Sequence, residues 1–316
     1  MWYCNINISI KKMRDIFPSI SILIPTFRRK EKIQNCLEAI LNQNYPLENI
    51  EVIIFDDGSG DDYVKEIYLL VEKIKLKGLN KIKVISSSNN VGLIKARNVL
   101  TKNVNENSKF LLFLDDDIYI HKDTINILVD SILRDNEIGV VGPKILLHKN
   151  PLIVLQSANF LNKWTGRYYA INSEHLLECD WIEPGCMLVR KEVITKINGF
   201  CEDFYRSHEG VDFCLRVRKI GYKIVYNPYA VVEHDVGVDK LTPERLYYIY
   251  RNKIFIIKKH LTFLGKVLSI FIILFFGLPI YILNSFIRNR KFKCFEIRLI
   301  IEAIIDGILD IKGKLY

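Results

Sequence analysis

Apolar runs alternate with segments of helical spacing through the first 135 residues of the chain. Four short runs hold mainly apolar residues, a pattern typical of strands buried on both faces of a parallel sheet. These runs cover residues 19–24, 49–55, 81–86 and 110–114. Between them, apolar residues recur with helical spacing at residues 31–43, 61–77 and around Ala96. The alternation predicts an α/β fold with a doubly wound, mostly parallel sheet over residues 19–135.

The middle of the chain has a different pattern. Between residues 139 and 190 the apolar runs are shorter, which suits an irregular extension of the sheet or a subdomain that faces a substrate. The runs are broken at Gly142-Pro143, Asn150-Pro151 and Pro184-Gly185. Short helices are predicted at residues 191–197 and 211–220, and a strand pair at residues 221–233, followed by His234. We expect residues 19–240 to form one catalytic domain, preceded by an extension at residues 1–18.

The last part of the chain, residues 241–316, is predicted to be a membrane-associated helical region. Val267 to Ile287 carries no charge over 21 residues, which is long enough to cross a bilayer as a helix. Length favours membrane insertion over a buried core helix, and either a single crossing or a re-entrant hairpin bent near Pro279 fits the pattern. Residues 295–311 are amphipathic and suit either the membrane surface or the surface of the enzyme.

The net charge limits the kinds of partner that suit the chain, and the cysteine content indicates its cellular environment. The formal net charge of +9 favours an anionic partner, such as nucleic acid, an anionic membrane surface or a phosphorylated substrate. Its basic residues concentrate around the apolar segment rather than on an aromatic-rich sheet face, so we expect no nucleic acid partner. The 7 cysteines are scattered without CxxC spacing, which favours a reduced, cytosolic environment over disulfides or a zinc site.

Two of the predicted strands end in carboxylates. Asp56-Asp57 follows the second strand, and Asp115-Asp116-Asp117 follows the fourth. Because the carboxyl ends of parallel strands meet at one edge of a sheet, both clusters can serve a single ligand. Carboxylates this close repel one another unless a cation lies among them, and a divalent metal is the economical choice. One cluster can then bind a base or ribose while the other holds a metal on a diphosphate.

These motifs, taken in order, resemble the family 2 glycosyltransferases, which have the GT-A fold, and their rhamnosyltransferase-like, polysaccharide-assembly members. The matching segments are residues 21–29, 56–59, 90–92, 96–98, 115–117, 181–190, 199–200, 209–216, 228–234 and 250–253. The resemblance extends over roughly residues 19–260. It implies a glycosyltransferase that moves a sugar from a nucleotide-sugar donor to a saccharide or lipid-linked acceptor by a single displacement with inversion. Residues 19–135 would bind the nucleotide and residues 136–240 the acceptor.

The resemblance also assigns roles to individual residues. Those expected to bind the donor are Pro25, Thr26, Asp56, Asp57, Arg97, Asp115 and Asp116. Asp117 and His234 would hold the divalent metal, Mg²⁺ or Mn²⁺, although His234 could also be a strand-end histidine bonded to backbone. Those expected in the acceptor-binding turn are Trp181, Glu183 and Gly185, with a core anchor as the alternative for Trp181.

The general base is the position at which the sequence departs from the family pattern. The residue most often assigned as the base aligns with Gly210, which cannot take a proton. Glu209 is the nearest substitute and Asp212 the second choice, since a base must reach the acceptor hydroxyl. The alternatives are that the acceptor is deprotonated differently or that the chain is a catalytically impaired sugar-nucleotide-binding protein.

Two other enzyme classes fit less well. A phosphatase with an Asp-x-Asp strand end would leave Asp56-Asp57 unexplained, and the later lysine and acidic motifs of that class are missing. A dinucleotide-binding oxidoreductase would need a third glycine after Gly58-Ser59-Gly60. We therefore expect a membrane-associated enzyme whose catalytic domain faces the cytoplasm and extends a lipid-linked saccharide, in cell-surface glycan or glycoprotein-precursor assembly.

Overall fold

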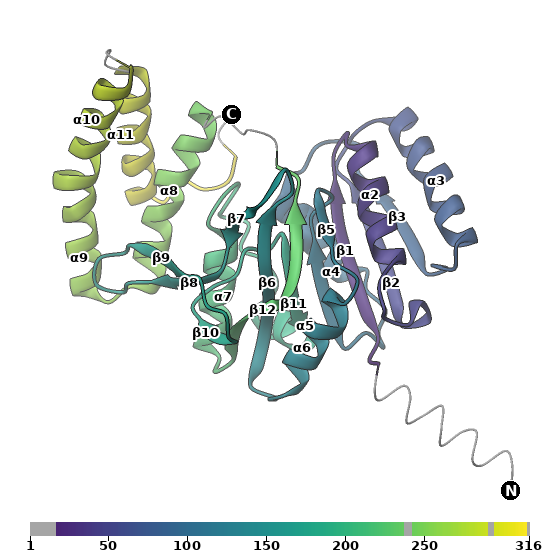
Figure 1. Cartoon of the computed structure of the whole chain (residues 1–316). Helices are drawn as coiled ribbons and strands as arrows, with labels where there is room; N and C mark the ends of the chain where they lie inside the picture. Colours follow the sequence, from purple (N-terminus) through teal and green to yellow (C-terminus); the bar gives the residue numbers. More distant parts are fainter. Residues whose placement is uncertain (1–16, 237–241, 290–293, 315–316) are drawn as a thin grey trace, which may run out of the picture.

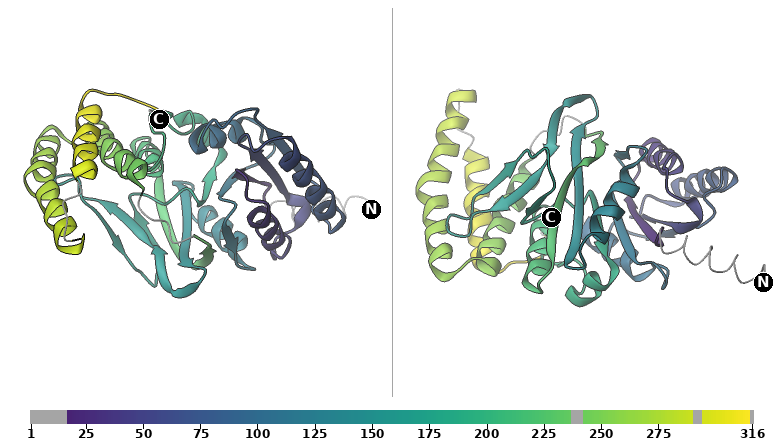
Figure 2. Two further views of the ribbon diagram at one scale, coloured as in Figure 1. Left: turned by 90° about the horizontal axis from the view of Figure 1, so that it is seen from above. Right: turned by 60° about the horizontal axis from the view of Figure 1, so that its bottom comes forward.

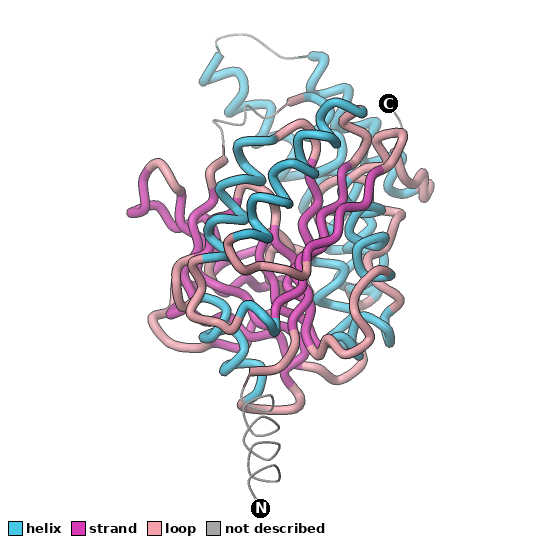
Figure 3. The backbone as a smooth tube through the Cα atoms, turned by 90° about the vertical axis from the view of Figure 1, so that its right-hand side faces the viewer, coloured by secondary structure: helices cyan, strands magenta, loops and turns pink. Residues whose placement is uncertain are grey.

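The fold is seen in a computed structural model of the chain, which describes residues 17–236, 242–289 and 294–314. Most of the predicted N-terminal extension therefore lies outside the described residues. The strands form a large sheet with the order β10-β12-β6-β11-β4-β1-β2-β3, flanked by helices (Figure 1). Seen from the side, the strands run between helices on either side of them (Figure 3). The predicted α/β class is confirmed.

The first four strands of the sheet are parallel, as predicted. Its strands are β1 (Ile20–Thr26), β2 (Ile50–Asp56), β3 (Ile82–Ser86) and β4 (Phe110–Leu114). The helices between them are α2 (Lys30–Leu41), α3 (Asp61–Leu76) and α4 (Leu93–Lys102). Along β1, Ile20, Ile22 and Ile24 pack with α2 and α3, whereas Leu23 packs with α4 on the other face. Burial on both faces explains why these strands are apolar throughout.

The second half of the sheet is mixed. Strand β11 (Cys186–Arg190) runs antiparallel between β4 and β6 (Ile138–Leu147), while β12 (Lys223–His234) is parallel to β6. Shorter strands complete it: β5 (Ile118–Ile120), β7 (Asn150–Gln156) and β10 (Leu177–Cys179). Its helices are α5 (Thr124–Leu133), α6 (Lys191–Ile197) and α7 (Glu209–Lys219). The broken middle segment is thus mainly an extension of the same sheet, with one separate hairpin, β8 (Ala158–Leu161) and β9 (Tyr168–Ile171).

The C-terminal helices gather at one end of the molecule, far from α2 and α3 (Figures 1 and 2). Helix α8 (Pro243–His260) is largely buried, and α11 (Cys294–Ile308) packs against it. Gly307 permits this approach, because a Cβ there would lie 2.7 Å from the Ile254 Cβ. The amphipathic segment therefore packs on the enzyme. It also keeps an apolar exposed side that includes Phe295, Ile301 and Ile305.

The long apolar segment forms one continuous helix. It consists of α9 (Phe263–Ile272), a π-helical turn (Ile273–Gly277) and α10 (Leu278–Asn289). Within it, Phe263–Asn284 has a mean hydropathy of 2.4 and is 6% buried, so it is not a core helix. The helix continues past Pro279 without a re-entrant hairpin, and a π-helical turn ends two residues before this proline. By length and composition this one helix could cross a membrane.

Gly307→Ala should destabilise the packing of α11 on α8. The added methyl group meets both Ile254 and the Arg251 carbonyl oxygen, at 2.7 and 2.9 Å. We expect a loss of about 1–3 kcal/mol in the free energy of unfolding, the usual cost of overpacking. The matched control is Gly277→Ala, whose methyl group meets only the Ile272 carbonyl at 3.7 Å. Equal denaturant midpoints for the two variants in detergent would contradict the close α8–α11 contact.

Candidate active site

A pocket of about 410 Å³ opens at the carboxyl ends of β1, β2 and β4. Its lining includes predicted site residues from distant parts of the chain: Pro25, Thr26, Asp57, Asp115, Asp116, Asp117 and His234. A larger hollow of about 860 Å³ lies at the opposite end of β4. There, Arg190 and Lys191 donate to backbone carbonyls and no aspartate lines the wall. Chemistry, rather than volume, therefore selects the smaller pocket as the candidate site.

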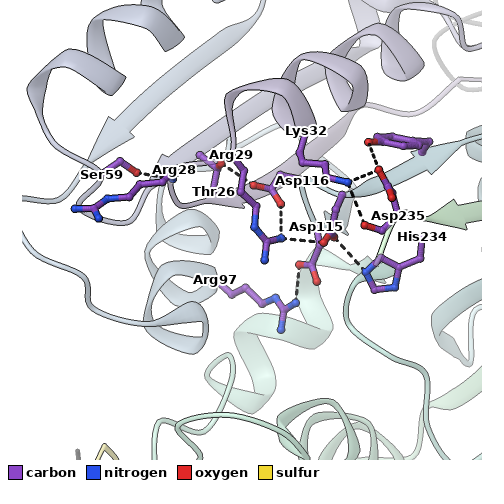
Figure 4. Close-up of polar contacts among 12 residues, drawn as sticks. Thr26, Arg28, Arg29, Lys32, Ser59, Arg97, Asp115, Asp116, His234 and Asp235 are labelled. Atoms are coloured by element: carbon purple, nitrogen blue, oxygen red, sulfur yellow. Dashed lines mark hydrogen bonds and ion pairs between the residues drawn. The ribbon is translucent and has the colours of Figure 1, made fainter. Parts of the chain in front are cut away.

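Asp116 is the most buried member of the carboxylate cluster after β4. Its carboxylate accepts hydrogen bonds from Thr26 Oγ1 at 2.7 Å and from Arg29 Nη1 at 3.2 Å (Figure 4). Burial raises its pKa to about 6, and the neighbouring carboxylates of Asp117 and Asp115 add to the effect, against the opposing effect of Thr26 and Arg29. Asp116 thus joins the ends of β1 and β4 and positions Arg29 at the pocket wall.

Asp117 and His234 meet at the pocket, as the metal prediction requires. The Asp117 carboxylate lies 3.2 Å from His234 Nε2 and 2.8 Å from Arg29 Nη1. Burial raises the pKa of Asp117, but the hydrogen bond and charge of His234, together with the charge of Arg29, lower the pKa overall. Within the described residues, no group of three or more His, Cys, Asp or Glu side chains could hold a metal ion. A carboxylate plus an imidazole suits a hard divalent cation that completes its shell with water and substrate phosphates.

Arg97 links two carboxylates that are far apart in the sequence. Its guanidinium, from α4, lies 2.7 Å from Asp115 Oδ1 and 3.0 Å from Glu209 Oε1, and the Arg97 side chain is 1% exposed. Asp115 follows β4, and Glu209 is the first residue of α7. This buried bridge joins the parallel half of the sheet to helix α7 and fixes both carboxylates beside the pocket.

Asp56 and Asp57 shape the other side of the pocket through backbone contacts. Asp57 accepts hydrogen bonds from the Val91 and Gly92 amides at 2.6 and 2.9 Å. The Ser59 amide donates to Asp56, which is fully buried at the end of β2. The turn before α4, predicted from sequence as a separate motif, is therefore held directly by Asp57.

The predicted acceptor turn lies next to this cluster. The Gly185 carbonyl accepts from the Asp115 amide at 2.8 Å, and a Cβ on Gly185 would lie 3.1 Å from Asp115 Oδ2. Glu183 is exposed to solvent and does not line the pocket, but desolvation by neighbouring parts of the chain and the charge of Glu209 raise its pKa to about 7. Trp181 packs edge-on to Tyr168 at 5.8 Å, at the margin of a core cluster.

The two candidate bases are both held by cations. Glu209 pairs with Arg97 and is 8% exposed. Asp212 pairs with Arg216 at 2.7 Å and with His260 at 2.9 Å, and is 1% exposed. Burial raises the pKa of Asp212, but the bonds from His260 and Arg216 lower it overall. Asp212 therefore fastens α7 to α8 and does not line the pocket.

Several residues of the pocket wall have no role predicted from the sequence. Arg29 counted only as part of a motif, whereas it binds two aspartates of the cluster. Other lining residues without a predicted role are Phe27, Asn90, Gly92, Leu93, Ala96, Tyr205, Arg206, Val236 and Arg245. A signal existed for Arg29, since paired arginines directly after an apolar strand suit an anion at the sheet edge. Arg206 and Arg245 arrive from distant loops and helices, which no local pattern indicates.

Comparisons with known proteins agree with this geometry. The sequence profile described as "Glycosyl transferase family 2" matches residues 21–197, more than half of the 316-residue chain. The amylovoran biosynthesis glycosyltransferase AmsB of Erwinia amylovora is 28% identical over 219 residues, which cover 67% of each chain. The chondroitin synthase of Pasteurella multocida is 24% identical over the whole of this chain, which covers 36% of that protein.

Among solved structures, the mannosyltransferase PcManGT from Pyrobaculum calidifontis, in complex with GDP-Man and Mn²⁺, shares the fold with a TM-score of 0.61. It is 14% identical, and the match covers 93% of this chain and 88% of that one. The profile match shows that the chain belongs to glycosyl transferase family 2. It is therefore a transferase enzyme, and the fold is the GT-A-like fold expected from the motifs.

Arg97→Met should cost about 3–5 kcal/mol of folding stability, because it leaves the charges of Asp115 and Glu209 without their buried partner. Arg218→Met is the control, since Arg218 is part-exposed and forms pairs of surface type with Glu178 and Asp180. Such pairs contribute about 0–1 kcal/mol. Chemical denaturation of both variants measures the difference, and equal losses would contradict the central position of Arg97.

Proposed function

We propose that the protein moves a sugar from a nucleotide-sugar donor to a saccharide or lipid-linked acceptor, with a divalent metal, in the assembly of a cell-surface glycan. The observation that carries the proposal is the single pocket in which Asp57, Asp115 and Asp117 meet Arg29 and His234. The biosynthetic role named for AmsB, and the GDP-Man and Mn²⁺ in the PcManGT structure, support it.

The two sides of the pocket suit the two parts of the donor. Asp57 and Asp115 are hydrogen-bond acceptors for the base and ribose. Arg29, Arg206 and Arg245 line the pocket and can bind phosphate oxygens. Asp117 and His234 would hold Mg²⁺ or Mn²⁺, which when bound neutralises the charge of the leaving diphosphate. Asp116 has the indirect role of holding Arg29 and the end of β1 in place.

The proposed reaction is a direct displacement with inversion. The acceptor oxygen forms a bond to the anomeric carbon, and the bond from that carbon to the diphosphate breaks with its electron pair on the nucleotide. The hydroxyl proton passes to a carboxylate on the acceptor side. The contribution of the chain is alignment of the two substrates and fixed charges around the diphosphate.

Membrane association is the second part of the proposal. The exposed apolar side chains of the α9–α10 helix include Val267, Phe271, Phe275, Phe276, Ile280 and Leu283. Trp164, 59% exposed at the tip of the β8–β9 hairpin, lies beside this helix, since its carbonyl accepts from Ser269 Oγ. Tryptophan is enriched at membrane interfaces. Because nucleotide sugars are cytosolic, we place the catalytic domain at the cytoplasmic face.

A catalytically impaired sugar-nucleotide-binding protein is the second candidate, favoured by Gly210 at the usual base position. An Asp-x-Asp phosphatase is disfavoured, because its nucleophile would be Asp115, whose carboxylate is tied to Arg97. Sugar transfer separates these functions. Purified full-length protein should transfer sugar from a UDP-, GDP- or dTDP-sugar, with Mn²⁺, to a saccharide or lipid-linked acceptor. Nucleotide binding without transfer to any acceptor would support the impaired protein.

Asp117→Asn should weaken Mn²⁺-dependent binding of the nucleoside diphosphate by at least about tenfold, since it removes a charged ligand from the proposed metal site. Isothermal titration with UDP, GDP and dTDP, each with and without Mn²⁺, measures the effect. Asp203→Asn is the control, because Asp203 pairs with Lys259 and Lys312 and does not line the pocket. Unchanged metal dependence in Asp117→Asn would refute this assignment.

Phe271→Asp combined with Phe275→Asp should abolish membrane binding, because an aspartate near the centre of a spanning helix costs about 2.5–3.5 kcal/mol. Both rings are exposed and stack on one another at 4.6 Å. Substitution is preferable to truncation after residue 262, which would also remove α11 from α8. Flotation with phosphatidylethanolamine–phosphatidylglycerol vesicles measures binding. The control is Leu76→Asp, at an 89% exposed site on α3; vesicle binding equal to that of the control would exclude membrane attachment through α9–α10.

A further inference from the structure

The usual base position has no room for a carboxylate in this fold. A Cβ on Gly210 would lie 2.5 Å from Pro184 Cδ and 3.2 Å from the Ile182 carbonyl oxygen. Real Cβ atoms do not approach other heavy atoms as closely as 2.5 Å, so the proline ring occupies the space that a side chain at position 210 would need. Pro184 and Gly210 are therefore sterically complementary. The residue directly before this proline is Glu183.

Three other carboxylates considered for this side of the site, Asp115, Glu209 and Asp212, are held by cations. Arg97 binds both Asp115 and Glu209, and Asp212 lies between Arg216 and His260. A proton on any of these groups would weaken an ion pair that the fold needs. In contrast, the Glu183 carboxylate has no hydrogen bond or ion pair to any described residue, and it keeps solvent contact.

The backbone on both sides of Glu183 is fixed. The Glu183 amide donates to Gln156 Oε1 at 2.7 Å, and two residues later the Gly185 carbonyl accepts from the Asp115 amide at 2.8 Å. The carboxylate is thus free to react but is carried by a rigid segment. The charged groups that act on it come from four elements: Glu209 on α7, Arg97 on α4, Asp115 after β4 and His234 at the end of β12.

Several buried polar atoms without hydrogen-bond partners lie in the region of Glu183. Trp181 Nε1, Tyr168 Oη and His208 Nδ1 are buried and have no hydrogen-bond partner in the part of the chain that is described. The ring centre of Tyr168 lies 5.8 Å from that of Trp181 and 5.4 Å from that of His208. The pKa of Tyr168 is raised by burial and by the charge of Glu183. These unsatisfied atoms are therefore grouped around Tyr168, within the electrostatic reach of Glu183.

We propose that Glu183, rather than a residue of α7, is the general base that takes the proton of the acceptor hydroxyl. This inference rests on the proposed function. The proton moves to a Glu183 carboxylate oxygen as the acceptor oxygen bonds to the anomeric carbon and the nucleoside diphosphate leaves. The pKa near 7 agrees with this role, since a base works best when its pKa is close to the working pH. Glu209 then has a positioning role through Arg97.

Glu183→Gln should lower kcat for sugar transfer by about 10²–10⁴-fold, the usual contribution of a general base, with little change in Mn²⁺-dependent nucleotide binding. It should also remove the rise of kcat with pH that deprotonation of Glu183 produces. Glu178→Gln is the control, because Glu178 is exposed and pairs with Arg218. Transfer by Glu183→Gln within threefold of wild type would overturn the proposal. Absence of both nucleotide binding and transfer in the wild type would instead refute the proposed function.

A rescue variant tests the spatial argument. Adding Pro184→Gly and Gly210→Asp to Glu183→Gln removes the obstructing ring and places a carboxylate at the usual position. We expect kcat to recover at least tenfold relative to Glu183→Gln alone. Gly210→Asp by itself, with Pro184 present, should lower stability rather than raise activity. A triple variant that binds the nucleotide yet shows no recovery of kcat would contradict the inference that Glu183 acts as the base in place of a residue at position 210.

Discussion

The buried guanidinium of Arg97 is the interaction on which the arrangement of the site depends. It connects α4, the end of β4 and the start of α7 through Asp115 and Glu209. A charge that is 1% exposed is stable only when its partners offset the loss of hydration, so the three groups must keep their positions together. The Phe200 ring, 5.7 Å from the guanidinium carbon, closes one side of this group. The relative position of the parallel strands and α7 is therefore fixed by this buried ion pair network as well as by apolar packing.

The carboxylates of the site that are paired with cations fall into two groups. Arg97 holds Asp115 and Glu209, while Arg29 and His234 surround Asp117. Groups fixed in this way are suited to binding and orienting charged substrates, because their geometry is set before the ligand arrives. A general base needs the opposite property, because it must take up a proton without breaking an ion pair. Glu183 has this property, whereas Asp57, which also lacks an ion pair, is bound by the Val91 and Gly92 amides.

The fold and the polar edge of the sheet could be predicted because their signals are local. Strands buried on both faces are apolar throughout, and the aspartates that follow them fall at one sheet edge. The partners of Asp212 could not be predicted, since His260 is 48 residues away and reaches it through the packing of α8 on α7. The fit of Pro184 against Gly210 likewise depends on a loop meeting a helix. Pro279 gave a local signal for a bend, but the helix continues through it, with a π-helical turn shortly before the proline.

The α9–α10 helix and the segment around Trp181 are parts of one packed unit. The turn between β8 and β9 meets α9, where Gly265 lies against the Lys163 carbonyl and Gly166 against Ser269. From the same hairpin, Tyr168 packs on Trp181, and Lys253 of α8 lies 3.3 Å from the centre of the Tyr168 ring. Burial lowers the pKa of Lys253 to about 7. Its ammonium group is stabilised mainly by the Tyr168 ring and by a hydrogen bond to the Gly166 carbonyl. A displacement of α9 would therefore be transmitted to Trp181 through one short hairpin. On the proposed function, in which α9–α10 lies in a membrane and Trp181 belongs to the acceptor site, this packing would keep the acceptor site at a fixed height above the bilayer.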